Sequence, residues 1–195
     1  MPEIILASAS PRRRELLKYI VPEFKVIPAD IDETIPDDIP AEKSAEFLAV
    51  KKAKHVSAGD PGSVVIGSDT VVIIDGEILG KPRDPSDAER MLRKLSGKTH
   101  SVITGVCLSC GDSTDSFSCK TAVKFFPLTD EEIRSYVDSG EPMDKAGAYG
   151  IQGKGCLLAE SIEGDFFNVV GLPASLLKRK LESFLRFIGE NENIL

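Results

Sequence analysis

The chain has 195 residues, 42% of them hydrophobic and 28% charged, and its formal net charge at pH 7 is −7. This apolar content excludes a disordered or low-complexity chain. The negative charge argues against a nucleic-acid-binding module, which needs a basic surface to bind phosphates. No apolar run approaches the ~20 residues that cross a bilayer. We therefore expect a single domain, residues 1–195, that binds neither nucleic acid nor membrane.

The chain also lacks the features of a secreted or zinc-binding protein. Its start, MPEIILASASPRRR, has a short apolar stretch that precedes the basic residues, unlike a secretory signal. The four cysteines are sparse and are expected to be reduced thiols. Cys107 and Cys110 have zinc-like spacing without a second pair, and neither histidine stands in a recognisable catalytic triad. A cytoplasmic location follows as the expectation.

Apolar periodicity and turn residues predict helices and strands in the first half of the chain. Ser10 is a good N-cap and Pro11 suits a first helical position, so a helix is expected to begin there. In chain order, the predicted segments are a strand at 3–7, a helix at 11–19, a strand at 24–28, an acidic loop at 29–40, a helix at 41–57 and a hairpin at 63–79 with its turn at 75–76.

The second half continues this alternation and ends in an amphipathic helix. The predicted segments are a helix at 85–95, strands at 100–108 and 116–126, a helix opened by a capping box at 129–132, a Gly-rich ordered loop at 141–155, a hairpin of strands 156–162 and 166–170, and a helix from 173. The apolar stripe of the last helix comprises Leu176, Leu177, Leu181, Phe184, Leu185 and Ile188. Helices interleaved with hairpins predict an α/β fold on a mixed sheet.

Three arginines, Arg12, Arg13 and Arg14, occupy the first turn of the first predicted helix. Cations at this position oppose the positive end of the helix dipole, whereas the unpaired N–H groups of the turn favour an anion. Together with the small-residue loop at 7–10, the arginines predict a phosphate site. The alternative is a solvated charged face without a function.

Two charged side chains interrupt apolar segments. Asp69 lies in a β-branched strand after Gly67, a glycine that permits a bulge or the close approach of a ligand. This carboxylate is either satisfied by backbone hydrogen bonds or serves as a general base or metal ligand. Lys52 lies at the centre of an apolar helix face and either extends toward water or reaches a cleft and binds an anion.

Two polar segments are further candidates. Lys81 and Arg83 follow the predicted hairpin, where they reach the same cleft or are ordinary loop charges. The Gly-rich segment 143–155 either folds tightly around a ligand or forms a tight surface turn. In the first case Gln152 offers both a donor and an acceptor to the edge of a base.

Several motifs, in order, closely resemble those of the Maf family of nucleotide pyrophosphatases. They are LASASPRRRELL at 6–17, GSDT at 67–70, GKPRD at 80–84, LSG at 95–97, DKAGAYGIQG at 144–153 and NVVGLP at 168–173. One departure is Ser68, where the family more often has alanine. The resemblance implies an elongated central mixed β-sheet flanked by helices, a cleft between two lobes as in inosine triphosphate pyrophosphatases, and a homodimer.

The resemblance also implies an activity, the hydrolysis of nucleoside triphosphates to the monophosphate and pyrophosphate with Mg²⁺ or Mn²⁺. It makes Asp69 the proton acceptor and gives catalytic roles to Glu33, Lys52 and Lys81. The phosphate-binding residues of the family fall on Ser8 or Ser10, Arg12 and Arg13. At Arg12, Thr70 and Gln152 the chain is similar to the branch that acts on dTTP and UTP.

A single mechanism accommodates both lines of reasoning. With a net charge of −7, the chain needs a local group of cations to attract a polyphosphate, and the candidates are Arg12, Arg13, Lys52, Lys81, Arg83 and Lys145. A divalent metal, held by Glu33, Asp69 or the phosphates, would neutralise the leaving pyrophosphate while Asp69 activates water. The alternative function is a non-catalytic nucleotide sensor that acts on a cell-division partner.

Overall fold

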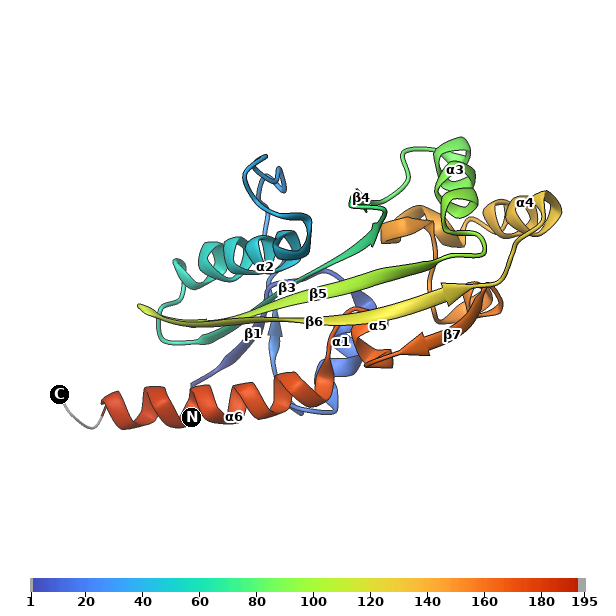
Figure 1. Ribbon diagram of the computed structural model, residues 1–195. Helices are drawn as coiled ribbons and strands as arrows, with labels where there is room; N and C mark the ends of the chain where they lie inside the picture. Colours follow the sequence, from blue (N-terminus) through green and yellow to red (C-terminus); the bar gives the residue numbers. More distant parts are fainter. Residues whose placement is uncertain (1, 193–195) are drawn as a thin grey trace. The chain divides into compact units, whose positions relative to one another are not determined.

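The computed structural model describes residues 2–192 and has one seven-stranded sheet. Six strands follow the order β2-β1-β3-β5-β6-β7, and β4 pairs with β3 (Figure 1). The strands are β1 (Ile4–Leu6), β2 (Lys25–Val26), β3 (Val64–Ile74), β4 (Glu77–Leu79), β5 (Thr99–Cys110), β6 (Ser113–Phe125) and β7 (Ala159–Glu163). β1 is parallel to β2 and β3, whereas the pairs β3–β4 and β6–β7 are antiparallel. The predicted α/β fold on a mixed sheet is confirmed.

Five of the six α-helices within residues 2–192 begin within one residue of the start that the sequence predicts. They are α1 (Pro11–Lys18), α2 (Ala41–Ser57), α3 (Pro85–Leu95), α4 (Asp130–Asp138), α5 (Phe166–Val170) and α6 (Ala174–Glu192). The Ser10 side chain accepts from the N–H of Arg13, and Thr129 and Glu132 form the predicted capping box. The loop at 141–155 contains three 3₁₀ turns, η1 (Glu141–Asp144), η2 (Ala146–Ala148) and η3 (Gly153–Leu157). No helix within residues 2–192 combines the length and apolarity of a membrane span.

The chain divides into two compact units. The first comprises the chain up to Asp69, Thr104–Cys119 and the chain from Gly171 onward. The second comprises Thr70–Ile103 and Lys120–Val170. The expected cleft between two lobes stays a prediction.

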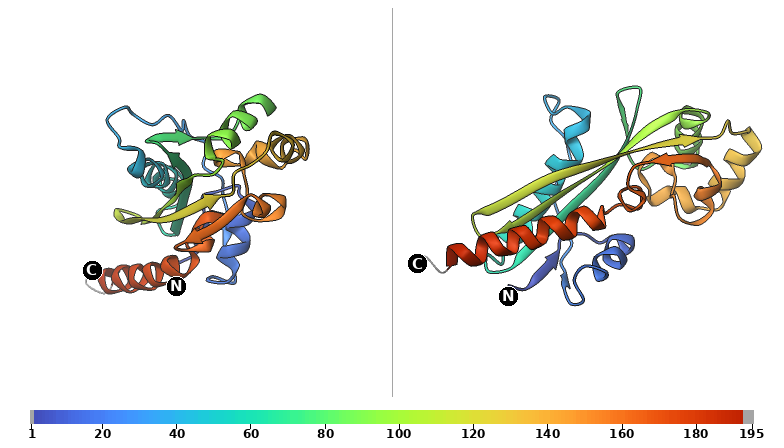
Figure 2. Two further views of the ribbon diagram at one scale, coloured as in Figure 1. Left: turned by 45° about the vertical axis from the view of Figure 1, so that its right-hand side comes forward. Right: turned by 60° about the horizontal axis from the view of Figure 1, so that its bottom comes forward.

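In the first unit, helices cover both faces of the β5–β6 hairpin (Figures 1 and 2). Side chains of successive strand residues point to opposite faces, and the contacts of β6 follow this alternation. Ser116 donates to Glu46 of α2 at 2.8 Å. Its neighbour Asp115 pairs with Lys180 of α6 at 3.3 Å, and the same lysine lies 5.6 Å from the ring centre of Phe117. Leu177, Leu181, Phe184 and Ile188 of the predicted α6 stripe are buried.

Two glycines bring α2 unusually close to the sheet. A Cβ at Gly67 in β3 would lie 2.3 Å from the carbonyl oxygen of Ala49. A Cβ at Gly105 in β5 would lie 2.3 Å from the backbone nitrogen of Glu46. Atoms of a real side chain do not approach backbone so closely, so only glycine fits at either position. The approach of a ligand predicted at Gly67 is therefore wrong, because a helix of the same chain occupies that position.

The second unit has its own core, and helices α3 and α4 lie side by side in it (Figure 1). Arg93 of α3 joins them through an ion pair with Asp130 at 3.0 Å. The largest buried apolar side chains of this core are Leu79, Leu92, Leu95, Phe125 and Ile133.

One predicted hairpin is wrong. Residues 159–163 form β7, which pairs with β6, but residues 166–170 form the short helix α5 instead of a returning strand. The carboxylate of Asp165 accepts from the N–H groups of Phe167 and Asn168, at 2.8 and 3.3 Å. An aspartate that accepts these two bonds caps a helix N-terminus, which outweighs the β-branched and aromatic composition of the segment.

Candidate active site

Lys52 and Asp69 form a largely buried ion pair in the first unit. Residues two apart in a strand share a face, so Asp69 points toward α2 like the glycine at position 67. Lys52 lies within one turn of Ala49 and Ala53, which contact that glycine. Its Nζ is 2.6 Å from Oδ1 of Asp69, and the two side chains are only 10% and 14% exposed. The close packing of α2 on β3 thus determines where the ion pair forms.

The same ammonium contacts a second carboxylate. Nζ of Lys52 lies 2.7 Å from Oε1 of Glu33, whose side chain is 56% exposed. Of the two interpretations of Lys52, the extension toward water is wrong, because its ammonium is shared between two carboxylates. The carboxylate of Asp69 contacts this side-chain ammonium, and the strand around it, β3, is continuous.

The acidic loop that carries Glu33 is tied to α2 by neighbouring residues. Lys51 donates to the backbone carbonyl of Asp32. The hydroxyl and N–H of Thr34 donate to Asp32 Oδ1 at 2.6 and 2.9 Å, and these bonds lower the pKa of Asp32. Lys51 and Lys52 therefore both hold this loop against α2, and Glu33 faces the Lys52 ammonium.

Arg13 connects three segments of the first unit. Its Nε donates to the carbonyl of Gly171 at 2.9 Å. Its Nη1 donates to the carbonyl of Ser68 at 2.9 Å and to the hydroxyl of Ser8 at 3.1 Å. The Ser8 hydroxyl also accepts from the N–H of Ser10. These acceptors compensate a cation in the first turn of α1, where the helix dipole is unfavourable to it.

Charges of both signs surround the guanidinium of Arg13. Burial lowers the pKa of its guanidinium, Asp69 and Glu33 raise it, and the neighbouring Arg12 lowers it. Arginine stays protonated despite such a shift. The first unit therefore brings Arg13, Lys52, Glu33 and Asp69 into one electrostatic cluster, with Ser8 and Ser10 at its edge.

The predicted site residues Thr70, Lys81 and Gln152 belong to the second unit. Lys81 and Gln152 are exposed, and Thr70 is partly exposed. Their proximity to Asp69 stays a prediction.

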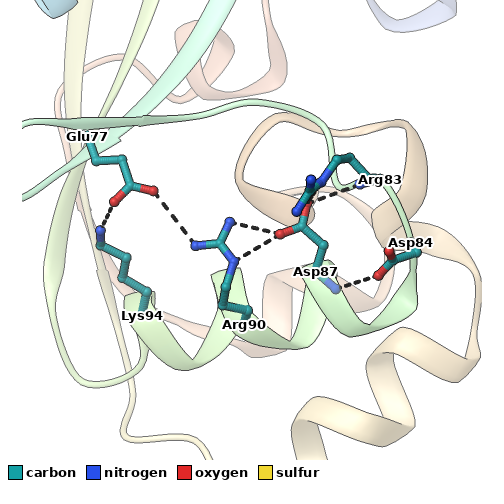
Figure 3. A network of polar contacts seen from close by, with 6 residues as sticks. All are labelled: Glu77, Arg83, Asp84, Asp87, Arg90 and Lys94. Carbon is teal, nitrogen blue, oxygen red and sulfur yellow. Dashed lines mark hydrogen bonds and ion pairs between the residues drawn. The ribbon is translucent and has the colours of Figure 1, made fainter.

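The loop that contains Lys81 ends in a network around the buried Asp87 (Figure 3). Asp87 accepts from the N–H and Nε of Arg83, at 3.2 and 3.4 Å, and pairs with Arg90 at 2.8 Å. Arg90 and Lys94 also pair with Glu77. The side chain of Arg83 is thus engaged beside α3, and the network holds the start of this helix.

Lys145 is similarly engaged within its own loop. Its ammonium contacts the carbonyl of Glu141 at 2.5 Å and the carboxylate of Asp144 at 2.6 Å. Its side chain is only 13% exposed. These contacts give Lys145 a structural part in the 141–155 segment.

Two buried polar groups of the second unit were not predicted. His100 bonds to the hydroxyl of Tyr149 through Nε2 at 2.7 Å, and its ring meets Phe125 edge-on at 5.0 Å. Burial lowers the pKa of His100 to about 4. Asn168 donates to the carbonyl of Val102 and the hydroxyl of Thr121, at 3.0 and 2.9 Å. The position of Asn168 in the NVVGLP motif was the only signal for it.

Nearly the whole chain matches one protein family. The profile of the family described as Maf-like protein matches residues 3–184. The chain belongs to the Maf family. A Maf-family relative named dTTP/UTP pyrophosphatase, from Symbiobacterium thermophilum, is 50% identical over 94% of this chain and 95% of its own length. A relative of the same name from Bacillus velezensis is 48% identical over 93% of this chain and 96% of its own length.

A solved structure supports the fold of this Maf chain. The HAM1 protein from Coxiella burnetii matches with a TM-score of 0.53 and 17% sequence identity. The match covers 94% of this chain and all of that one. At this identity the likeness concerns the fold alone, and it agrees with the fold class that the sequence predicts.

Proposed function

We propose that this Maf-family protein hydrolyses dTTP and UTP to the nucleoside monophosphate and pyrophosphate. The observation that carries the proposal is the largely buried Lys52–Asp69 pair beside Glu33 and Arg13. Enclosed carboxylates and cations of this kind are typical of catalytic sites. The names of the curated relatives support the choice of substrate.

In the proposed reaction, Asp69 is the general base. Its carboxylate takes a proton from water as the water oxygen bonds to the α-phosphorus. The bond from this phosphorus to the bridging oxygen breaks, and the electron pair leaves with pyrophosphate. Lys52 orients the carboxylate through its contact with Oδ1. General-base catalysis of this type contributes about 10²–10⁴-fold to a rate.

The phosphates require cations because the chain as a whole is acidic, with a net charge of −7. We assign phosphate contacts to Ser8, Ser10, Arg12 and Arg13 on the first unit. We also assign a catalytic contact to Lys81. Recognition of the pyrimidine is assigned to Thr70 and Gln152, since an amide can pair with the O4 and N3–H edge of uracil or thymine.

A divalent cation fits this site only in combination with the substrate. Within residues 2–192 no group of three His, Cys, Asp or Glu side chains is arranged to hold a metal. Mg²⁺ commonly binds one or two carboxylates and completes its shell with water and phosphate oxygens. Glu33 and Asp69, joined through Lys52, supply two such carboxylates. When bound, Mg²⁺ or Mn²⁺ would stabilise negative charge on the phosphate oxygens.

The decisive experiment measures pyrophosphate release from dTTP and UTP in the presence of Mg²⁺. We expect turnover by the wild type and a fall of about 10²–10⁴-fold in kcat for Asp69→Asn, with nucleotide binding largely retained. Asp75→Asn is the matched control, because Asp75 is an exposed carboxylate at the end of the same hairpin. A wild type that binds dTTP without releasing pyrophosphate would favour the nucleotide-sensing alternative. Near-normal turnover by Asp69→Asn would reject this residue as the base.

We also propose that the protein is a cytoplasmic homodimer without affinity for nucleic acid. Sedimentation would test the dimer, and titration with labelled oligonucleotides at low salt would test the second point, since phosphate-backbone binding is strongest there.

A further inference from the structure

The side chain of Glu141, at the start of η1, meets the backbone on one side of Gln152. Its Oε2 accepts from the N–H of Lys154 at 3.0 Å, and its Oε1 accepts from the N–H of Gly155 at 3.2 Å. Oε1 also accepts from the hydroxyl of Tyr136 at 3.0 Å. This carboxylate therefore fixes the chain two and three residues after Gln152.

Tyr136, on α4, completes the arrangement on the other side. Its hydroxyl accepts from the N–H of Gly150, at 3.1 Å, while it donates to Glu141. Tyr136 is 4% exposed, so its hydroxyl is held in a protected environment. The two side chains form a clamp, Glu141–Tyr136, that holds the backbone before and after Gln152.

The clamp is made of strong interactions. An ionised carboxylate that accepts several hydrogen bonds binds its donors more tightly than a neutral oxygen does. Burial raises the pKa of Glu141, but the bonds from Lys154, Gly155 and Tyr136 together lower it by more. The pKa is therefore below its ordinary value, and the carboxylate stays charged.

The clamp also determines the shape of the turn. Gly153 has a φ of +73°, and a Cβ there would lie 2.8 Å from Oε2 of Glu141. The chain thus turns tightly against the carboxylate, with no room for a side chain. Gln152 itself, directly before Gly153, has an extended backbone and is exposed.

We propose that the Glu141–Tyr136 clamp determines base selectivity by positioning Gln152. The proposal rests on the proposed function, in which Gln152 contacts the pyrimidine. An amide on a fixed backbone distinguishes the O4 of thymine from the amino group of cytosine, because the wrong base leaves polar groups unpaired. An amide on a mobile turn adapts to either base. Both members of the clamp are positioning residues, since they act through Gln152.

The first test is Glu141→Gln, which preserves size but replaces one acceptor oxygen with an amino group. We expect the ratio of kcat/KM for dTTP to that for dCTP to fall about 10-fold, mainly through KM for dTTP, with kcat nearly unchanged. Glu131→Gln, an exposed position on α4, is the matched control for charge and should leave the ratio unchanged. Tyr136→Phe removes one hydroxyl and should act in the same direction, which provides a second variant if Glu141→Gln folds poorly.

A second readout does not depend on turnover. In the nucleotide-free protein, hydrogen exchange at the amides of Gly150, Lys154 and Gly155 should accelerate in Glu141→Gln but not in Glu131→Gln. Unchanged exchange at these amides would overturn the clamp itself.

A double-mutant cycle tests whether the clamp acts through Gln152. Gln152→Ala alone should abolish most of the preference for dTTP, and Glu141→Gln added to it should change the ratio little further. Additive effects, or an unchanged ratio in Glu141→Gln while the wild type turns over dTTP, would overturn the selectivity role alone. Absence of pyrophosphate release by the wild type would instead overturn the proposed function together with this role.

Discussion

The surroundings of Asp69 in the first unit and the 141–155 segment in the second are held in place by different means. Asp69 lies on a long strand, and its partner lies on a helix that packs against that strand backbone to backbone. The 141–155 segment has only 3₁₀ turns and depends on side chains such as Glu141 and Tyr136. Within it, Ala148 has a φ of 59°, which is unfavourable for a residue other than glycine.

The two regions should therefore lose stability in response to different substitutions. The Asp69 region should tolerate the loss of single hydrogen bonds but not added volume between strand and helix. The 141–155 segment should be sensitive to the loss of a single hydrogen bond, because single polar contacts determine its conformation. Three predictions test this contrast, in addition to those on Asp69 and Glu141.

The largest effect is expected for Gly67→Ala. The new Cβ would lie 2.3 Å from a backbone oxygen of α2, which cannot turn aside as a flexible side chain does. Overpacking of this severity should lower the free energy of unfolding by about 3 kcal/mol. Urea unfolding measures this loss, and Gly80→Ala, where a Cβ meets nothing within 4 Å, is the matched control. Equal stability of the two variants would contradict the close packing of α2.

The next effect concerns His100, which supports Tyr149 in the second region. Burial lowers the pKa of folded His100 to about 4, from an ordinary value of 6.5. Protons then bind the unfolded chain first as the pH falls, so stability declines between about pH 6.5 and 4. The decline attributable to this residue reaches up to about 3 kcal/mol.

Urea unfolding from pH 7.5 to 4 measures this decline. His100→Gln should remove that part of the pH dependence, whereas His55→Gln, at an exposed position, should not. The chain has two histidines, so the pair of variants accounts for both. Identical pH profiles for the two variants would reject the assignment to His100.

The smallest effect returns to β3, at Ser68. Its hydroxyl is buried, and within residues 2–192 it has no hydrogen-bond partner. Removing a buried unsatisfied hydroxyl relieves a desolvation cost, so Ser68→Ala should stabilise the protein by about 1 kcal/mol, or about 2–4 °C in Tm. Ser63→Ala, which loses a bond of 2.8 Å to Asp60, should not stabilise it. A lower Tm for Ser68→Ala would show that the hydroxyl has a partner in solution.

Much of the fold was predictable because local signals agreed with the tertiary structure. The predicted bounds of α2, 41–57, match the structure, and the N-cap at Ser10 and the capping box at Thr129 are confirmed. The sequence does not predict α5, because a five-residue segment is too short to show a helical period and Asp165 is equally compatible with a turn.

The site was predictable only in part. Charges within apolar patterns identified Asp69 and Lys52, and the structure joins them. The family resemblance alone suggested Glu33. The contacts of Glu141 were not predictable, because two of its partners are backbone N–H groups, which do not depend on residue type, and the third is the hydroxyl of Tyr136 on another element.

The contact between α2 and the sheet at Gly67 has a practical consequence for protein engineering. A library that seeks new nucleotide preferences gains nothing from randomising Gly67, where any other side chain would collide with the backbone of α2. Diversity is better introduced at the exposed Gln152 and Lys154, with Glu141 and Tyr136 left unaltered at first, so that surviving clones differ in nucleotide binding and not in folding.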